Sequence, residues 1–202
     1  MEEACLQRSF FAQHTWLVCQ PGQQPTPASA LRALEGIANA LSAQIEANVG
    51  EVSRDALAAK PPFEGNSIPS ISLKDYAIRI WNYTKVSPLC MLVAYTYVDF
   101  LFARKRCHIT RLTSHRLLLT AVLLAAKCYE DTIYNNIYFA KVGGITSAEL
   151  NMLEVEMLKL LDFRLLVDVE DLQKRLLLLE QGQLAMCKEA PEASGVHICY
   201  GV

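Results

Sequence analysis

The feature that most constrains this chain is an apolar run, LLLTAVLLAA, at residues 117–126. A transmembrane helix needs about 20 apolar residues, and this run has about half of that length. A helix that is apolar on all sides must instead be enclosed by other elements. The run therefore predicts a core helix, over about 112–128, with further elements packed around it.

The rest of the chain carries helical signals. Apolar residues recur at steps of three and four, and Ser72, Ser87 and Thr146 are placed as helix N-caps. Further helices are expected over about 29–49, 72–84, 88–101, 131–141 and 146–161, with a last one that starts at Asp168 or Asp171 and runs to about 181. No segment shows the clean alternation of a half-buried strand. We predict an all-α protein, a bundle of five helices around a buried central helix, with an additional N-terminal helix.

Proline- and glycine-rich stretches suggest the organisation of the chain. One of them, QPGQQPTP, covers residues 20–27, and another, AAKPPFEGNSIPS, covers residues 58–70. We expect a flexible N-terminal extension (1–28), an N-terminal helix with a proline-rich linker (29–66), the main helical domain (67–180) and a C-terminal tail (181–202).

Charge and cysteine content narrow the function classes. The chain has 19 Lys and Arg and 21 Asp and Glu, a net charge of −2, which gives no bulk attraction to nucleic acid or to an anionic membrane. The basic segment RKRCHITR, residues 104–111, is expected to be a solvated loop. The seven cysteines show no C-x-x-C pair and are expected to be free thiols in a reducing compartment. An intracellular protein, in the cytoplasm, the nucleus or both, is the expectation.

Signatures of catalysis are missing from the sequence. It contains no H-E-x-x-H, no G-x-S-x-G and no phosphate-binding G-x-x-x-x-G-K-[ST] motif. Cys128 could serve as a nucleophile, but it ends a buried helix, where thiols are usually inert. We therefore expect no enzymatic activity, no cofactor, no bound metal and no small-molecule substrate.

Two charged residues stand among apolar ones. On a wheel of 100° per residue with Leu150 at zero, Glu154 falls at about 40°, inside the apolar stripe of its helix. Lys127 directly follows the apolar run. The two could pair as a buried structural ion pair, or Lys127 could extend to water at the helix end. Alternatively, the pair lies at a rim of the bundle and offers its hydrogen-bonding groups to a partner.

The same residues carry a resemblance to a known family. The segments LLLTAVLLAAKCYED and TSAELNMLEVEMLKLLDFRL look like the cyclin box, and YNNIYFAKVGGITSAELNMLE closely resembles a motif of the single-box P/U-type cyclins, a class named for phosphate-pathway members. The similarity covers about residues 67–180. It departs at Phe100, where the family commonly has an arginine after Asp99, which puts the usual internal ion pairing of that arginine in doubt.

The resemblance implies a cyclin-box fold and a regulatory role. It places Lys127 and Glu154 on the pair with which cyclins bind backbone groups of a cyclin-dependent protein kinase near its αC helix, and it makes Glu130 and Asp131 weaker candidates for that contact. The implied function is binding and activation of such a kinase, with no role for nucleic acid, membrane or small molecule. The alternative is a cyclin-like interaction module with a non-kinase partner, of the transcription-factor type; a basic face would favour that alternative.

Overall fold

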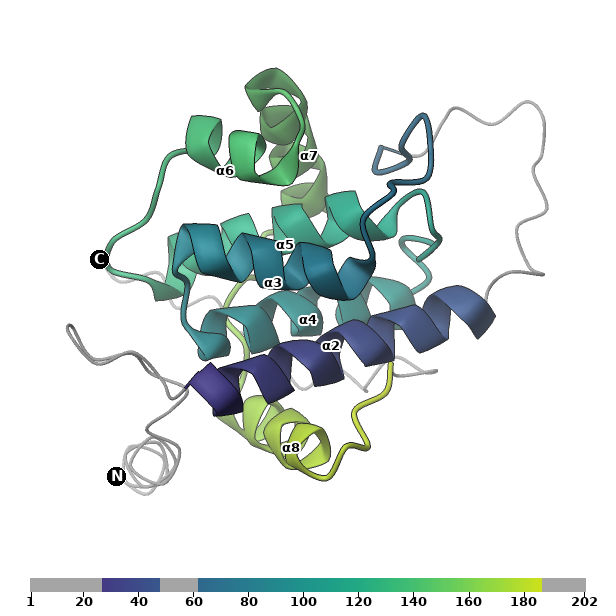
Figure 1. Ribbon diagram of the computed structural model, residues 1–202, viewed down its shortest axis with the longest axis vertical. Helices are drawn as coiled ribbons and strands as arrows, with labels where there is room; N and C mark the ends of the chain where they lie inside the picture. Colours follow the sequence, from purple (N-terminus) through teal and green to yellow (C-terminus); the bar gives the residue numbers. More distant parts are fainter. Residues whose placement is uncertain (1–26, 48–61, 187–202) are drawn as a thin grey trace.

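The computed structural model describes residues 27–47 and 62–186, and within these ranges the chain forms helices and no strand. The helices are α2 (Pro27–Ala47), α3 (Leu73–Thr84), α4 (Pro88–Ala103), α5 (Ser114–Tyr129), α6 (Asn136–Gly143), α7 (Ser147–Leu160) and α8 (Val169–Glu180) (Figure 1). The all-α prediction is confirmed. The predicted extension before residue 27, much of the linker (48–61) and the tail beyond 186 lie outside the described residues.

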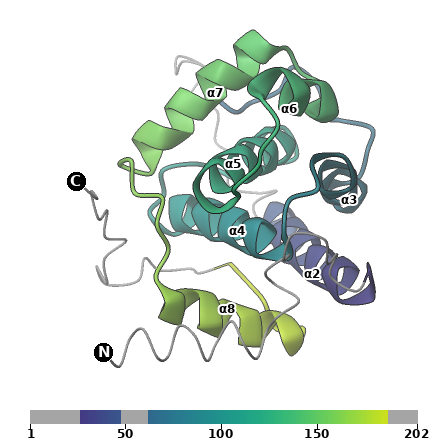
Figure 2. The ribbon, with the colours of Figure 1, turned by 90° about the vertical axis from the view of Figure 1, so that its left-hand side faces the viewer.

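Two adjacent helices, α4 and α5, form the centre of the bundle (Figure 2). Every residue of the apolar run 117–126 is buried, as the sequence predicts. Almost all of α4 is buried as well, because α2 and α8 pack against it while α5 covers another side. Helices α3, α6 and α7 pack against α5. The core therefore has two enclosed helices, whereas the sequence singled out one.

Local capping explains where the helices begin. The hydroxyls of Ser72, Ser87 and Thr146 each accept a hydrogen bond from a backbone N–H three residues later, as predicted. The helix expected over 131–141 begins later, at Asn136. Its N-cap is Asn135, whose side chain accepts from the N–H of Tyr138. The last helix starts after Asp168, the first of the two positions expected for it.

Helices α2 and α8 approach each other closely at Gly36. A Cβ atom added to Gly36 would lie 2.4 Å from Cδ1 of Leu179 on α8, so a larger residue there would displace the end of the Leu179 side chain. Glycine weakens a helix by about 1 kcal/mol relative to alanine, and the close packing against Leu179 offsets part of that cost. After α6, Gly144 adopts φ +72°, the left-handed conformation that ends helices and that glycine tolerates best.

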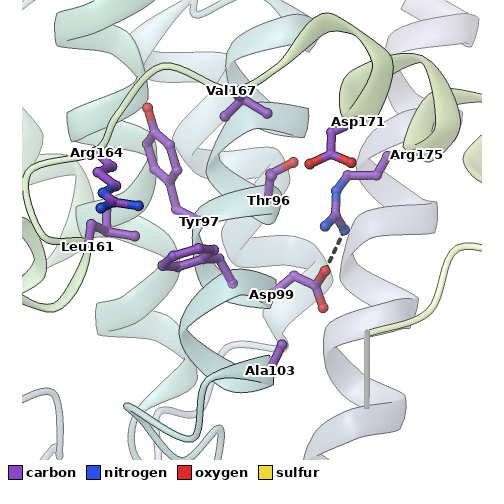
Figure 3. Close-up of a pocket in the computed structure, with 10 residues that line it drawn as sticks. Thr96, Tyr97, Asp99, Ala103, Leu161, Arg164, Val167, Asp171 and Arg175 are labelled. Atoms are coloured by element: carbon purple, nitrogen blue, oxygen red, sulfur yellow. Dashed lines mark hydrogen bonds and ion pairs between the residues drawn. The ribbon is translucent and has the colours of Figure 1, made fainter. Parts of the chain in front are cut away.

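A buried ion pair fastens α8 to the core. Arg175 of α8 donates to the carboxylate of Asp99 on α4, and the two side chains are 11% and 1% exposed (Figure 3). Phe100 replaces the arginine that the family commonly has beside Asp99, yet this carboxylate still has a guanidinium partner. The guanidinium belongs to Arg175, which lies 76 positions after Asp99 in the sequence.

None of the described helices combines the length and the apolar character that a membrane crossing demands.

Candidate functional site

The structure brings Lys127 and Glu154 together. Lys127 lies in the last turn of α5, where the helix dipole favours a cation, and its Nζ donates to Oε1 of Glu154 on α7. The lysine side chain is 34% exposed and the glutamate side chain is 14% exposed. The pair therefore lies at an edge of the bundle, and it is neither fully buried nor fully solvated.

A hydrogen-bonded neighbour from α6 completes the arrangement. Nδ2 of Asn136 donates to Oε2 of Glu154 at 2.7 Å and to Oδ1 of Asn151 at 2.7 Å. Each carboxylate oxygen of Glu154 thus has a donor, which fixes the orientation of the group. An ammonium has three N–H donors, and the structure shows one of those of Lys127 engaged with Glu154. The cluster Lys127–Glu154–Asn136 therefore has hydrogen-bonding capacity left for a partner.

The two acidic candidates after α5 differ from each other. Oε1 of Glu130 accepts from the backbone N–H of Ser87 at 2.7 Å, so its carboxylate is directed at the start of α4. This contact ties the end of α5 to the N-cap residue of α4 and gives Glu130 a role inside the fold. Asp131 is exposed in the segment between α5 and α6.

Exposed apolar side chains lie on and next to the two helices, α6 and α7, that contribute Asn136 and Glu154. Tyr134 stacks on Tyr138 with ring centroids 4.1 Å apart, and together with neighbouring residues they line an open hollow of about 550 Å³. The exposed apolar residues next to or on α6 and α7 are Ile133, Tyr134, Ile137, Met152 and Val155. A monomeric protein seldom exposes so many large apolar groups together, and such patches mark interaction surfaces. We call these five residues and the cluster the α6–α7 face.

The thiol next to the pair does not have the properties of a nucleophile. Burial raises the pKa of Cys128, and the charge of Lys127 opposes that rise only in part. The protonated thiol therefore predominates at neutral pH, and a thiolate is the reactive form. Within residues 27–47 and 62–186, no three His, Cys, Asp or Glu side chains are grouped to hold a metal ion.

Asn136 and the exposed patch were not identified from the sequence. Helix α6 starts at Asn136, five residues later than the start of the helix expected over 131–141, and the Asn136 amide contacts Glu154 on α7. The signal that existed was the N-cap pattern at Asn135, with a hydrogen bond back from the Tyr138 N–H.

Comparison with known proteins places this chain in a family. The family described as Cyclin matches residues 28–165. Cyclin-U3-1 of Arabidopsis thaliana is 46% identical over 106 residues, which cover 52% of this chain and 48% of that protein. Cyclin-P3-1 of Oryza sativa subsp. japonica is 40% identical over 129 residues, 64% of this chain and 55% of that protein. Cyclin-U1-1 of Arabidopsis thaliana is 49% identical over 107 residues, 52% of this chain and 50% of that protein. The chain spans about half the length of these curated relatives.

Proposed function

The chain belongs to the cyclin family, in its P/U-type class, and on that premise we propose that it is the regulatory subunit that binds and activates a cyclin-dependent protein kinase. The observation that carries the proposal is the Lys127–Glu154 pair at the edge of α5 and α7, held by Asn136. This regulator has no chemistry of its own and acts inside the cell, in the cytoplasm, the nucleus or both.

The contact follows from the chemistry of the α6–α7 face. The ammonium of Lys127 donates to backbone carbonyls of the kinase, and the carboxylate of Glu154 accepts from its backbone N–H groups. A hydrogen bond to a charged group contributes about 1.5–3 kcal/mol when it is shielded from water. The flanking apolar residues, among them Ile137 at 68% exposed, provide that shielding once the kinase covers them.

Activation follows from selective binding. In the active kinase, the αC helix lies inward, where its Glu pairs with the Lys that contacts ATP, and the magnesium-binding Asp is in place. A regulator activates the kinase if it binds this arrangement more tightly than the inactive one. The α6–α7 face is proposed to do so by docking on the αC helix. Asp131, exposed beside this face, adds a weaker contact, while Glu130 contributes mainly through its bond to Ser87.

The decisive experiment compares two glutamates of the same helix. Glu154→Ala is expected to abolish both capture of a cyclin-dependent kinase from cell extract and its activity toward a peptide substrate. Glu156→Ala is the matched control, because Glu156 is also on α7 but pairs locally with Lys159. The control should bind and activate like the wild type. If the folded Glu154→Ala variant activates the kinase normally, the assignment of the site is wrong.

A further inference from the structure

The basic segment 104–111 is not used by the α6–α7 face. Its first residues follow α4 directly, and Arg104, Lys105 and Arg106 stand in succession there. In the structure this segment lies against the end of α7, because Nη1 of Arg106 donates to the carbonyl of Leu160 and pairs with Asp162 at 2.8 Å. The ends of α4 and α7 are thereby held side by side.

This contact gathers positive charge on one part of the surface. The Arg106 hydrogen bond lowers the pKa of Asp162, and the charges of Arg164 and Arg104 lower it further, so all three guanidinium groups lie near that carboxylate. Three guanidinium groups thus share one carboxylate, and the exposed Lys105 stands between Arg104 and Arg106 in the sequence, in a chain whose net charge is −2. We call Arg104, Lys105, Arg106 and Arg164 the basic cluster. Its charge excess is a local property of the surface that the total composition conceals.

An apolar hollow opens next to the basic cluster. It is small, with a cavity volume of about 30 Å³, and apolar side chains of Phe100, Leu161 and Val167 line it. Arg164 lies at one end of the hollow beside Leu161 and Tyr97, and Asp171 lies at the other end with the Asp99–Arg175 pair (Figure 3). The guanidinium of Arg104 stacks 4.3 Å over the Phe100 ring, which joins the cluster to the wall of the hollow.

We propose that the basic cluster and the apolar rim of this hollow together bind an acidic segment of another protein, whose carboxylates contact the arginines and whose apolar side chain packs against the rim. Arginine pairs with a carboxylate through two parallel N–H groups, so Arg104 and Arg164 suit this ligand. The proposal does not depend on the kinase contact, which uses the α6–α7 face. If both are correct, the site would select the proteins that the kinase complex recruits.

The charge distribution favours a short acidic segment over nucleic acid. A nucleic acid strand is negative along its whole length and stacks its bases on open aromatic rings. Here the far end of the hollow carries Asp171, which repels a continuing phosphate chain, and the Phe100 ring already holds the Arg104 guanidinium. An acidic stretch adjoining one apolar residue matches both ends of the site. Its carboxylates face the arginines at one end, and only its apolar residue approaches Asp171 at the other.

The test measures binding of labelled peptides to the purified chain by fluorescence anisotropy. The probe is a twelve-residue peptide with a run of glutamates on one side of a leucine and uncharged glycines and serines on the other, compared with one in which glutamine replaces every glutamate. We expect the glutamate peptide to bind about tenfold more tightly or better, with an affinity that falls as salt rises. Serine in place of leucine should weaken binding about threefold or more, because the apolar rim of the hollow then stays exposed to water.

Two charge-matched variants decide whether this particular cluster is responsible. The triple variant Arg104→Gln, Lys105→Gln, Arg164→Gln keeps Arg106, which supports the end of α7, and should weaken binding about tenfold or more. The control Arg32→Gln, Arg79→Gln, Lys141→Gln removes the same charge from exposed positions on α2, α3 and α6 and should leave affinity within about twofold of the wild type. If thermal melting shows that the triple variant is unfolded, the binding of the single variant Arg164→Gln is measured in its place.

Three outcomes would overturn the proposal. They are equal binding of the glutamate and glutamine peptides, equal losses in the two triple variants, and tighter binding of a single-stranded twelve-nucleotide DNA than of the glutamate peptide. The last outcome would assign the basic cluster to nucleic acid.

Discussion

Among the ion pairs that join described helices in this cyclin, two differ sharply in their access to water. Asp99 and Arg175 link α4 to α8 with side chains 1% and 11% exposed. Lys127 and Glu154 link α5 to α7 with side chains 34% and 14% exposed. The charged groups are of the same types in both pairs, a carboxylate and a nitrogen cation. Their surroundings therefore decide what each pair can do.

A buried pair is enclosed by its own chain and offers little to another molecule. Removing two charges from water costs several kcal/mol per ion, and only good geometry and additional hydrogen bonds offset that cost. A pair at an edge costs less to form and contributes less to stability, usually below about 1 kcal/mol. The comparison indicates that the Asp99–Arg175 pair serves the fold, and that the Lys127–Glu154 pair is better suited to binding than to stability.

The largest expected effect comes from breaking the buried pair. Arg175→Met leaves the Asp99 carboxylate in the core without its guanidinium, and loss of one member of a buried pair typically costs about 3–5 kcal/mol. Urea denaturation should show a loss of this size in the free energy of unfolding. For a chain of this length, the melting temperature should fall by roughly 6–20 °C.

A second variant shows whether the buried charge itself causes that loss. The double variant combines Asp99→Leu with Arg175→Met, so apolar side chains replace both charges. Such replacements are often neutral or stabilising. We expect the double variant to recover about half or more of the lost stability. A double variant less stable than Arg175→Met would show that the cavity or the other contacts of these residues dominate, and that the comparison of the two pairs is incorrect.

A smaller effect on stability is expected at the edge pair. Lys127→Ala and Glu154→Ala should each lower the free energy of unfolding by only about 1 kcal/mol, because water can solvate the remaining partner. A double-mutant cycle measures the coupling between the two side chains, and we expect about 0.5–1 kcal/mol. A coupling as large as that of the buried pair would assign Lys127 and Glu154 a structural role instead.

The sequence predicted the edge pair better than the buried one, for a physical reason. Glu154 interrupts an apolar stripe and Lys127 extends an apolar run, so each is unusual within its own helix. The partner of Asp99 could not be found this way, because Arg175 lies on a helix whose position depends on how the whole bundle packs. Local signals also located the N-caps of α3, α4 and α7, and Asn135 carried such a signal for α6, whereas the amide contact from Asn136 to Glu154 depends on tertiary structure.

The smallest expected effect is a pH dependence of the folding stability caused by His115. It bears on the pH at which the two ion pairs should be compared. The His115 imidazole packs on Tyr76 with ring centroids 4.9 Å apart, and its Nε2 lies 3.0 Å from the carbonyl of Ile71. Burial lowers the pKa of His115 below its usual 6.5; the hydrogen bond to Ile71 opposes this shift, and the charge of Arg116 adds to it. The folded chain therefore favours the neutral ring.

The sign of the pH dependence follows from this shift. Between the lowered pKa and about 6.5, the unfolded chain binds more protons than the folded one, so stability rises with pH in that window. The contribution is complete above about pH 6.5 and is lost as pH falls through the folded pKa. The gain in unfolding free energy from acid to neutral pH should be smaller in His115→Gln than in the wild type. If the two pH profiles run parallel, His115 does not titrate differently on folding, and the ion pairs could be compared at any pH in this window.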